Sequence, residues 1–539
     1  MRLFRNTALA VSVPALAVST MFGSQPARAQ QNGQYVYHLP AQSLELSLRA
    51  IAARSGRNIG AAASVLAGRT APALDGAFTT EGAVGRVLAG TDLRYRAVGS
   101  DLIIEAIARD SVSESSEERQ GTSITVTGSR IRGAPVASPT ISVDREAIIA
   151  SGQTGLAEVA RNLPQSFGGG QNLGVGANVG SANGINVGGA ATINLRGLGS
   201  DATLTLLNGH RLAYNGSRQG VDVSAIPLGA VDRLEVVADG ASALYGSDAV
   251  AGVANIILRR DFEGLTVDLD GGLATQGGYS RQRVAATTGA KWRSGGIIAS
   301  YEYARSTSLR SDERDFARSR PGVIIFPPTE RHAIVLSGHQ ELTERLSFAA
   351  DLLFNRRRTE IGFPDNPAGD LSVSRTEQPS TSRSFAVAPS LTLELPGGWR
   401  GALSGVYGKE RVFTRANNFV GQTLIRSTPL CYCNDGKSFE LAADGGLFDL
   451  GGGTARAALG AGYRSNLLNA DRGPGNVANV RRSQDSYYAY GELNVPLASP
   501  FQGRKGLYRL NLSAALRYER YPGIDEVVTP KLGQPVDCR

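Results

Sequence analysis

The pattern of hydrophobic and polar positions changes near residue 264, and this change divides the chain into two parts. Before it, short alternating runs are mixed with runs of helical spacing. After it, apolar and polar residues alternate with period two over stretches of about 10–13 residues. The clearest examples are 346–354, 385–393 and 510–518. Because successive side chains of a strand point to opposite faces, each stretch predicts a strand with one apolar and one polar face.

Strands of this kind are typical of a transmembrane β-barrel, whose apolar face meets lipid and whose charged face lines a wet lumen. We predict tight turns at 293–295 and 396–398 and long polar connections at 306–329 and 359–381. Short turns on one side and long loops on the other are the outer-membrane pattern. Aromatic residues that suit an interfacial girdle are Tyr301, Tyr303, Trp399, Tyr407 and Tyr518. The alternative, a soluble β-sandwich, would rarely keep charged inner faces on strands this long.

Residues 35–107 predict a small α+β domain. Its expected elements, in order, are a strand at 35–39, a helix at 43–54, a second helix within 78–89, and a hairpin of 93–97 with 102–105. The Ser/Glu-rich stretch 109–122 predicts a flexible linker. Directly after it, residues 124–128 read Ile-Thr-Val-Thr-Gly. On a loose tether such a β-prone segment can add a strand to the edge of a partner's sheet, and the alternative is the first strand of the next domain.

Residues 135–262 predict a mixed α/β domain. We expect a helix at 154–162 ended by Pro164, a Gly/Asn-rich loop at 168–190, strands at 192–196, 203–207, 234–237 and 253–258, and a turn at Asn208-Gly209. The run 197–202 (GLGSDA) fits the G-x-G-x-x-A pattern of a dinucleotide site, but a strand follows it where such a site needs a helix. Since no constellation of catalytic residues stands out either, the sequence predicts neither an enzyme nor a cofactor.

The N-terminus predicts export. Arg2 and Arg5 precede an apolar run at 7–22 that contains Pro14, and Ala27-Arg28-Ala29 fits a signal peptide at 1–29, cleaved after Ala29. No later run of 18 or more apolar residues exists, which excludes an ordinary helical membrane protein.

Composition and charge add little to this picture. The net charge is +8, and since only five of the 56 basic residues are lysines, the basic side chains are almost all arginines. They are interleaved with 48 acids and form only short tracts such as Arg356-Arg357-Arg358, which favours a solvated surface over a nucleic-acid site.

Three cysteines, Cys431, Cys433 and Cys538, leave open a loop disulfide within the C-x-C pair, free thiols, or pairing elsewhere. The four histidines are dispersed, so no metal site is predicted.

Three motifs resemble the TonB-dependent outer-membrane receptor family. They are 193–197 (INLRG), 205–209 (TLLNG) and, most specifically, 231–258 (VDRLEVVADGASALYGSDAVAGVANIIL), which is similar to the family's plug signature. Residues 35–107 resemble the secretin-and-TonB N-terminal (STN) signalling domain, and residues 124–130 (ITVTGSR) lie where the family has its TonB box. The resemblance implies an α+β STN domain, an α/β plug domain at 135–262 and a membrane β-barrel from 264 onward.

What the resemblance implies is active import across the outer membrane of a Gram-negative cell. The substrate would be a scarce large nutrient, with a ferric siderophore favoured and an oligosaccharide as the alternative. TonB, with its energising complex in the inner membrane, would pair with the box and pull, while the STN domain in the periplasm would signal to an anti-sigma regulator. Outer-membrane lipid would surround the barrel, and no nucleic-acid partner is expected. Alternatives of another class are a non-transporting periplasmic signalling or binding protein and a secreted Gly-rich adhesin.

The resemblance also assigns candidate site residues. Those that would bind TonB are Ile124, Thr125, Val126 and Thr127. The plug charges that would face the barrel wall are Arg196, Arg233 and Glu235. The candidates for ligand contact, on the apical segments 168–190, 200–201 and 214–219, are Gln171, Asn172, Asn178, Ser200, Asp201, Tyr214 and Arg218.

The barrel region is shorter than the resemblance requires. About ten antiparallel strands are expected between 264 and 521, whereas plugged outer-membrane transporters have about 22. At about 26 residues per strand, 22 strands need about 570 residues, and 276 follow residue 263. An open half-barrel would expose strand edges to lipid, where unpaired backbone groups are costly. We therefore expect a truncated barrel, from a fragment, a frameshift or a shortened gene product.

Overall fold

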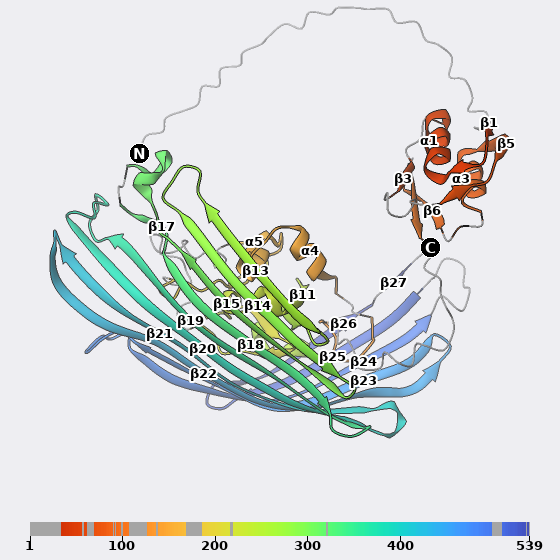
Figure 1. Ribbon diagram of the computed structural model, residues 1–539. Coiled ribbons are helices and arrows are strands. Elements are labelled where there is room, and N and C mark those ends of the chain that lie inside the picture. Colours follow the sequence, from red (N-terminus) through yellow and green to blue (C-terminus); the bar gives the residue numbers. More distant parts are fainter. Residues whose placement is uncertain are drawn as a thin grey trace, which may run out of the picture. The chain divides into compact units, whose positions relative to one another are not determined.

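A computed structural model of the chain divides it into two compact units, residues 1–121 and 122–539, which are described separately below (Figure 1). The described residues are 34–55, 59–61, 69–89, 91, 93–98, 101–106, 127–135, 138–168, 186–215, 219–319, 322–498, 509–534 and 536–537. The predicted signal peptide, the linker at 109–122, the first three residues of the predicted TonB box and Cys538 lie outside these ranges.

The first unit has the α+β organisation that its sequence predicts. Its helices are α1 (Leu44–Ser55) and α3 (Thr80–Leu88), and its strands are β1 (Gln34–Leu39), β2 (Gln42–Ser43), β3 (Ile59–Ala61), β4 (Thr70–Ala71), β5 (Leu74–Thr79), β6 (Leu93–Val98) and β7 (Asp101–Ala106). The predicted hairpin is the antiparallel pair β6–β7. Helix α3 begins after Thr79, whose side-chain oxygen accepts a hydrogen bond from the Gly82 N–H as an N-cap. The two helices bury Leu48, Ile51, Val84 and Val87 in one core.

The second unit begins with a mixed α/β plug built on a five-stranded sheet. The sheet has the order β10-β9-β12-β11-β8, with β8 (Thr140–Asp144), β9 (Thr203–Leu207), β10 (His210–Arg211), β11 (Val231–Val237) and β12 (Gly252–Leu258). Helices α4 (Arg145–Ala150), α5 (Leu156–Asn162) and α6 (Ser242–Tyr245) and the short 3-10 turns η1 (Val223–Ala225), η2 (Leu228–Ala230) and η3 (Ser247–Ala249) complete it. The expected strands at 203–207, 234–237 and 253–258 are confirmed. Asn208 and Gly209 form the predicted turn, both with positive φ.

The strand predicted at 192–196 is wrong. This segment is extended and buried up to Leu195, but it joins no sheet and makes only an isolated bridge from Leu195 to Ser166. The Leu195 N–H donates to Thr203 Oγ1 at 3.0 Å and the Arg196 N–H donates to the Gln165 carbonyl at 2.7 Å. Arg196 then has a φ of 57°, which ends the extended run. Apolar alternation indicated the burial of this segment but could not show that its backbone bonds to a side chain of β9 and to a loop carbonyl instead of a neighbouring strand.

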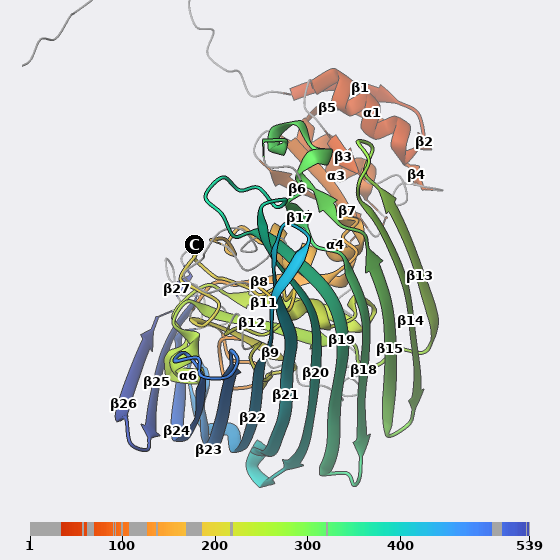
Figure 2. The ribbon, with the colours of Figure 1, turned by 90° about the vertical axis from the view of Figure 1, so that its left-hand side faces the viewer.

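A large antiparallel sheet follows the plug and curves around it (Figures 1 and 2). Its strands, in neighbouring order, are β13 (Gly264–Leu273), β14 (Ser280–Trp292), β15 (Gly295–Ser306), β18 (Thr329–Glu341), β19 (Leu346–Pro364), β20 (Ser374–Glu394), β21 (Arg400–Val420), β22 (Thr423–Leu450), β23 (Gly453–Asp471), β24 (Val480–Ala498), β25 (Arg509–Tyr521) and β26 (Asp525–Gly533). The short β27 (Val536–Asp537) also pairs with β25. Within the described residues β13 and β26 are the two edges, so the sheet is open.

Several strands are longer than the 10–13 residues that the alternation predicts. Strand β22 has 28 residues, and β20 and β21 have 21 each. The expected loop 359–381 is mostly strand, because β19 continues to Pro364 and β20 begins at Ser374. The strands continue to pair through their backbones beyond the apolar band. The sequence there is largely polar, so the alternation of side chains no longer predicts a strand. The other expected long loop, between β15 and β18, is present and contains β16 (Leu309–Arg310), β17 (Ile324–Phe326), η4 (Ser311–Glu313) and η5 (Asp315–Ala317).

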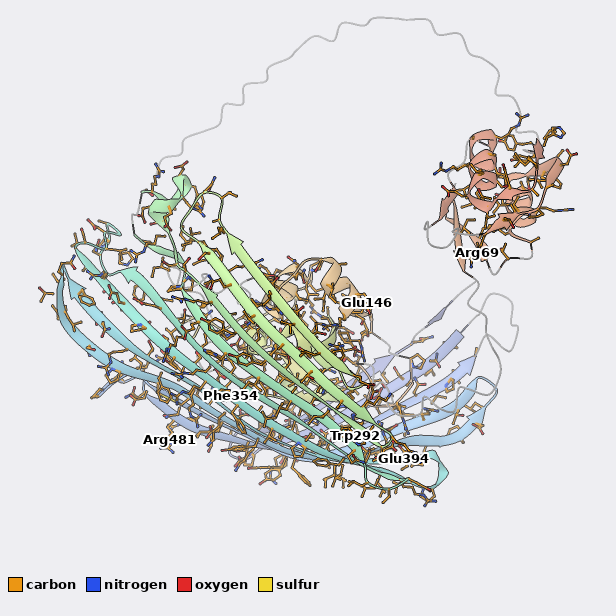
Figure 3. All side chains as sticks on the ribbon, viewed as in Figure 1. Arg69, Glu146, Trp292, Phe354, Glu394 and Arg481 are labelled. Carbon is orange, nitrogen blue, oxygen red and sulfur yellow. A yellow bond between two sulfur atoms is a disulfide. The ribbon has the colours of Figure 1, made fainter. Side chains whose placement is uncertain are left out.

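The two faces of this sheet have the polarity of a membrane barrel. Phe354 is 37% exposed on the outer face (Figure 3). Its neighbour Asn355 is fully buried on the inner face. Along β25, Leu516 is 53% exposed and Arg517 only 3%. Apolar side chains therefore point outward and polar ones point inward toward the plug, as predicted. In the described part of the chain, no helix combines the length and the apolar character needed to cross a membrane.

The sheet has two different ends. One carries the tight turns after β14, β18, β20 (here η6, Pro396–Gly398) and β22, and Trp292 and Glu394 lie there (Figure 3). The opposite end carries the longer connections 307–328, 365–373 and 472–479, together with the shorter ones 274–279, 421–422 and 522–524. By the outer-membrane rule, the end with tight turns faces the periplasm.

The C-x-C pair forms a disulfide between Cys431 and Cys433, with Cα atoms 5.7 Å apart. This resolves the choice that the sequence left open for these two cysteines. The bond lies within strand β22 and not in a loop.

Candidate functional site

The start of the second unit is clamped by a buried carboxylate. The Thr127 N–H donates to Glu235 Oε2 at 2.9 Å, and the Thr127 hydroxyl donates to the same oxygen at 2.5 Å. Asn255 Nδ2 donates to Thr127 Oγ1 at 3.1 Å. Thr127 is 1% exposed and Glu235 is 4% exposed. Strands β11 and β12 thus supply two side chains, in register opposite each other, that fix the backbone just after residue 126.

The next residues bind both the plug and the surrounding sheet. The Ser129 hydroxyl and the Arg130 N–H donate to the two oxygens of Glu492 at 2.8 and 2.5 Å. The Arg130 guanidinium lies 3.2 Å from Glu440 and stacks on the rings of Tyr245 and Tyr490. Charge-assisted bonds in a water-poor interface are among the stronger protein contacts, so Arg130 is a firm anchor between plug and sheet.

Arg132 places this segment at the periplasmic end of the sheet. Its guanidinium lies 3.5 Å from Glu394 and 3.6 Å from Asp444, beside the tight turn after β20. Its carbonyl accepts a hydrogen bond from Arg456 at 2.8 Å. Residues 127–132 therefore leave the plug on the side that faces the periplasm.

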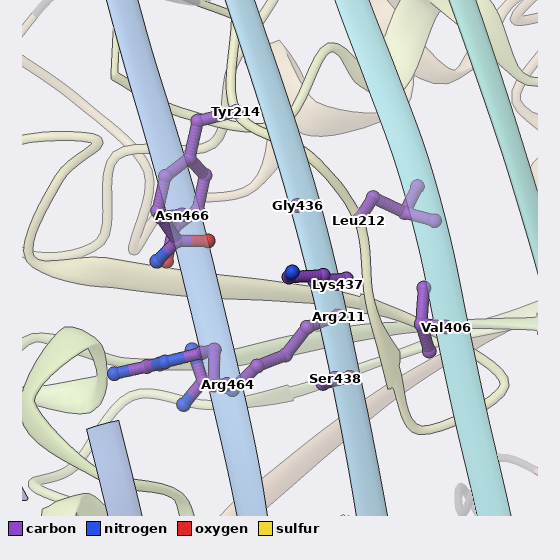
Figure 4. Close-up of a pocket in the computed structure, with 9 residues that line it drawn as sticks. All are labelled: Arg211, Leu212, Tyr214, Val406, Gly436, Lys437, Ser438, Arg464 and Asn466. Atoms are coloured by element: carbon purple, nitrogen blue, oxygen red, sulfur yellow. The ribbon is translucent and has the colours of Figure 1, made fainter. Parts of the chain in front are cut away.

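Asp248 in η3 is the centre of a second cluster between plug and sheet. It accepts from Arg464 of β23 at 2.9 Å and also from Arg211 and the Tyr214 hydroxyl. Figure 4 shows these three partner side chains where they line a small cavity. Burial alone would raise the pKa of Asp248, but Arg211 and Arg464 outweigh it and hold the pKa well below its usual range. Burial and the Asp248 charge raise the pKa of Tyr214. The cavity beside these side chains is about 10 Å³, room for about one water molecule.

A third cluster holds the end of the Gly/Asn-rich loop near the opposite end of the sheet. Arg357 of β19 is 2% exposed and lies 2.8 Å from Asp222. It also donates to the Gly189 carbonyl at 2.7 Å, and Ser382 of β20 donates to the Gly188 carbonyl at 3.0 Å. A Cβ atom at Gly188 would lie 2.8 Å from Ser382 Oγ, so only glycine fits there without displacement. The last residues of the loop 168–190 are thereby fixed to the sheet.

The structure describes about half of the predicted site residues. Ile124, Thr125, Val126, Gln171, Asn172, Asn178 and Arg218 lie outside the described ranges. Ser200 is 3% exposed, and Asp201 and Arg196 are exposed. Arg233 pairs with Asp232 and Glu235, both at 2.8 Å, so these two predicted plug charges bond within the plug and, through Glu235, to Thr127.

Sequence reasoning missed the residues that join plug and sheet. These are Arg130, Asp222, Asp248, Arg357, Glu440, Arg464 and Glu492. The available signal was a charged residue at an inward position of an alternating strand, as Arg357 is between the outward-facing Arg356 and Arg358. An inward position predicts that the side chain faces the plug, but it does not predict the residue to which that side chain bonds. In each case the bonded residue lies more than 100 residues away in sequence.

Comparisons with known proteins agree with this architecture. Residues 133–253 match the family model described as "TonB-dependent Receptor Plug Domain". Pseudomonas aeruginosa FpvA, solved bound to pyoverdines, is 12% identical with a TM-score of 0.53, covering 94% of this chain and 69% of that one. The siderophore receptor PirA from Acinetobacter baumannii is 14% identical with a TM-score of 0.55, covering 74% and 59%. The ferric enterobactin receptor PfeA from P. aeruginosa is 16% identical with a TM-score of 0.55, covering 73% and 59%. This chain thus spans 59–69% of the length of these structures.

Proposed function

We propose that this chain, which has the plug domain of TonB-dependent receptors and the fold of their outer-membrane barrels, takes up a ferric siderophore across the outer membrane. The observation that carries the proposal is the clamp on Thr127. It fixes to the plug the end of a segment whose preceding residues are suited to bind TonB, on the periplasmic side of the sheet. The siderophore is favoured over an oligosaccharide because the similar structures include receptors named for siderophores, pyoverdine and ferric enterobactin.

In this proposal, Ile124, Thr125, Val126 and Thr127 form the TonB-binding segment. An extended segment gains main-chain hydrogen bonds when it pairs with the edge of a partner's sheet, and those bonds can transmit a pull. The pull would act first on the Thr127–Glu235 hydrogen bonds, because they fix the last residue of this segment to the plug. Force would then reach β11, which carries Glu235, and the central strand β12, which carries Asn255.

The ligand would bind at the opposite end of the plug, on the segments 168–190, 200–201 and 214–219. The Arg357–Asp222 cluster supports this placement by holding residues 188 and 189 against the sheet. Residues 214 and 215 are held in the same way, since Asn434 donates to the Tyr214 carbonyl at 2.8 Å and Asn215 donates to Glu410 at 3.1 Å. Gln171, Asn172, Asn178, Ser200, Asp201, Tyr214 and Arg218 remain the candidate contacts.

We also propose that the first unit, residues 35–107, is an STN domain that reports ligand binding to an anti-sigma regulator. What supports this is its separate α+β core, which packs independently of the plug and sheet. A domain on its own tether can exchange partners without disturbing the receptor.

The test is uptake of radioactive iron by cells that express the chain as their only candidate receptor. Val126→Pro removes a backbone N–H that strand pairing with TonB needs, and it should abolish uptake while siderophore binding is retained. Glu146→Gln, an exposed change on α4, serves as the control (Figure 3). Uptake by Val126→Pro equal to that of the unchanged chain would contradict the TonB-driven mechanism. Binding without uptake in the unchanged chain would instead favour a non-transporting receptor.

A further inference from the structure

Four cationic or cation-forming side chains lie side by side on the outer face of the sheet. Strand register pairs His332 with Arg356, Arg356 with Arg383, and Arg383 with Arg411, across β18, β19, β20 and β21. We call these four residues the basic row. The residues beside them in sequence, Ala333, Arg357, Ser382 and Val412, are buried toward the plug, so the row points outward.

Like charges placed directly opposite one another destabilise a pair of strands, so the basic row needs a compensating anion. Carboxylates of the described residues compensate only part of the positive charge of the row. Arg411 pairs with Asp435, but within the described ranges neither Arg356 nor Arg383 has a carboxylate within 4.0 Å. Arg356 is half-exposed and Arg383 is exposed, so an external anion can reach both side chains from the outer face.

The position of the basic row along the strands shows at which depth in the membrane the anion would bind. Below it, toward the periplasmic end, the outward side chains of β20 are Phe385, Val387, Pro389, Leu391 and Leu393. Arg383 is ten residues from Leu393, about 34 Å along the strand at about 3.4 Å per residue. At a strand tilt of about 40° this is about 26 Å along the membrane normal, the height of the apolar band of an outer-membrane barrel. The row therefore lies at the outer interface of the membrane.

Aromatic side chains of the kind found at membrane interfaces flank the row. The Tyr301 hydroxyl is 2.9 Å from His332 Nδ1, and the ring of Tyr303 lies 5.0 Å from that of His332. Phe354 and Phe385 pair with each other one step below the row. Tyrosine belongs where an apolar layer meets a polar one, which agrees with the depth inferred from the strand.

A groove on the same outer face lies below the row. It has a volume of about 340 Å³, and its lining includes Ile297, Leu336, Gly338, Phe348, Leu352 and Val387. The hollow lies at Gly338, which has no side chain between those of its neighbours. Leu336, Leu352 and Val387 are each four residues from a member of the row on the same strand, so an acyl chain could run from one to the other.

We propose that the basic row is a binding site for a phosphate-bearing lipid of the outer leaflet. Arg356 and Arg383 would hold the phosphate, because two neighbouring guanidinium groups offer forked donors that match its oxygens. Arg411 and His332 would flank the bound phosphate at the two ends of the row. The groove at Gly338 would receive an acyl chain.

The test measures lipid binding to the full chain, purified in detergent and stripped of lipid, by native mass spectrometry. The probe is hexa-acylated lipid A with both phosphates, compared with the same lipid after dephosphorylation. We expect the phosphorylated lipid to bind at least tenfold more tightly. Arg356→Gln/Arg383→Gln should weaken its binding about thirtyfold, since each basic residue near an anionic lipid surface contributes about fivefold.

The matched control is Lys291→Gln/Arg293→Gln, which removes two exposed charges at the periplasmic end and should leave binding unchanged. Fluorescence of Trp292 and Trp399 checks that each variant is folded. If the double variant does not fold, each single variant should still lose about fivefold. Equal binding of the dephosphorylated lipid, unchanged binding by the row variants, or an equal loss in the control would overturn the proposal. Displacement of the lipid by millimolar inorganic phosphate would assign the row to a free anion and overturn it as well.

Discussion

Thr127 and Glu235, 108 residues apart, are joined by two hydrogen bonds to a single carboxylate oxygen. Glu235 is held in turn by Arg233 at 2.8 Å, and it is almost fully buried. Hydrogen bonds to a charged group contribute about 1.5–3 kcal/mol each, so this contact can hold the segment before it near the plug until work is done on it. Breaking the Thr127–Glu235 hydrogen bonds would therefore release the segment before Thr127 from the plug.

Glu235→Gln should loosen the segment that precedes Thr127. The amide is neutral, and one of its two head atoms is a donor, so it cannot reproduce both charge-assisted bonds. A loss of about 1.5–3 kcal/mol would raise the population of the released segment by about 10- to 150-fold. The measurement is the rate of maleimide labelling of Val126→Cys in a Cys538→Ser background. Glu146→Gln is the control, and equal labelling rates in all three proteins would refute the clamp.

Arg130→Met should destabilise the second unit by about 1.5–3 kcal/mol. It leaves the half-buried Glu440 carboxylate with hydrogen bonds from the Tyr488 and Tyr490 hydroxyls but without its cationic partner. Arg130→Met/Glu440→Gln removes both charges and should melt at a higher temperature than Arg130→Met alone. Thermal unfolding followed by circular dichroism measures both values. Additive losses in the double variant would mean that the two side chains do not depend on each other.

Gly188→Ala should displace the end of the 168–190 loop. The added methyl would lie 2.8 Å from Ser382 Oγ and 3.1 Å from a Val412 methyl, so the expected cost is about 1–3 kcal/mol. Ser382→Ala in the same protein removes the closer atom and should recover part of the loss. Gly271→Ala meets no atom within 4 Å and is the control. Melting temperature and siderophore affinity are the readouts, and a fully stable Gly188→Ala protein would contradict the close approach.

Acid should weaken the attachment of η3 to the sheet. The folded-state pKa of Asp248 is depressed, so its contribution to stability is fully present above about pH 4 and is lost as pH falls through the folded pKa. At neutral pH, Asp248→Asn should therefore lower stability by about 3 kcal/mol, because Arg211 loses its carboxylate. The difference between the two proteins should shrink progressively below pH 4. Denaturant titrations at a series of pH values provide the check, and a difference that is constant from pH 7 to pH 2 would contradict this role.

The alternating stretches show how far pattern alone can go. Phe354 and Asn355 have opposite environments because a strand turns each successive side chain to the other face, and no tertiary information is needed for that. The plug shows where pattern fails. The apolar residues at 192–196 are buried as their sequence suggests, but their backbone bonds to Gln165 and Thr203, which no periodicity could identify.

The Arg356-Arg357-Arg358 tract shows both what alternation predicts and what it cannot predict. Alternation separates Arg357 from its two neighbours, yet it does not reveal that Arg357 binds Asp222 and Gly189 or that Arg356 stands beside Arg383. The first contact spans more than 130 residues of sequence, and the second depends on the register of two strands. A tract that composition treats as ordinary surface charge therefore contributes both to the plug attachment and to the proposed lipid site.

The sequence by itself determined the properties that depend on neighbouring residues: the α+β and plug elements, the two faces of the long strands and the likeness of 231–258 to a plug signature. These follow from local backbone geometry and from the burial of apolar side chains, which a short window of sequence contains. Only the tertiary structure decided which polar and charged groups meet, as in Thr127 with Glu235 and Ser129 with Glu492, 363 residues away. The reason is physical: an ion pair or hydrogen bond across the plug and sheet needs two groups within about 3 Å, and strand register and sheet curvature set that distance.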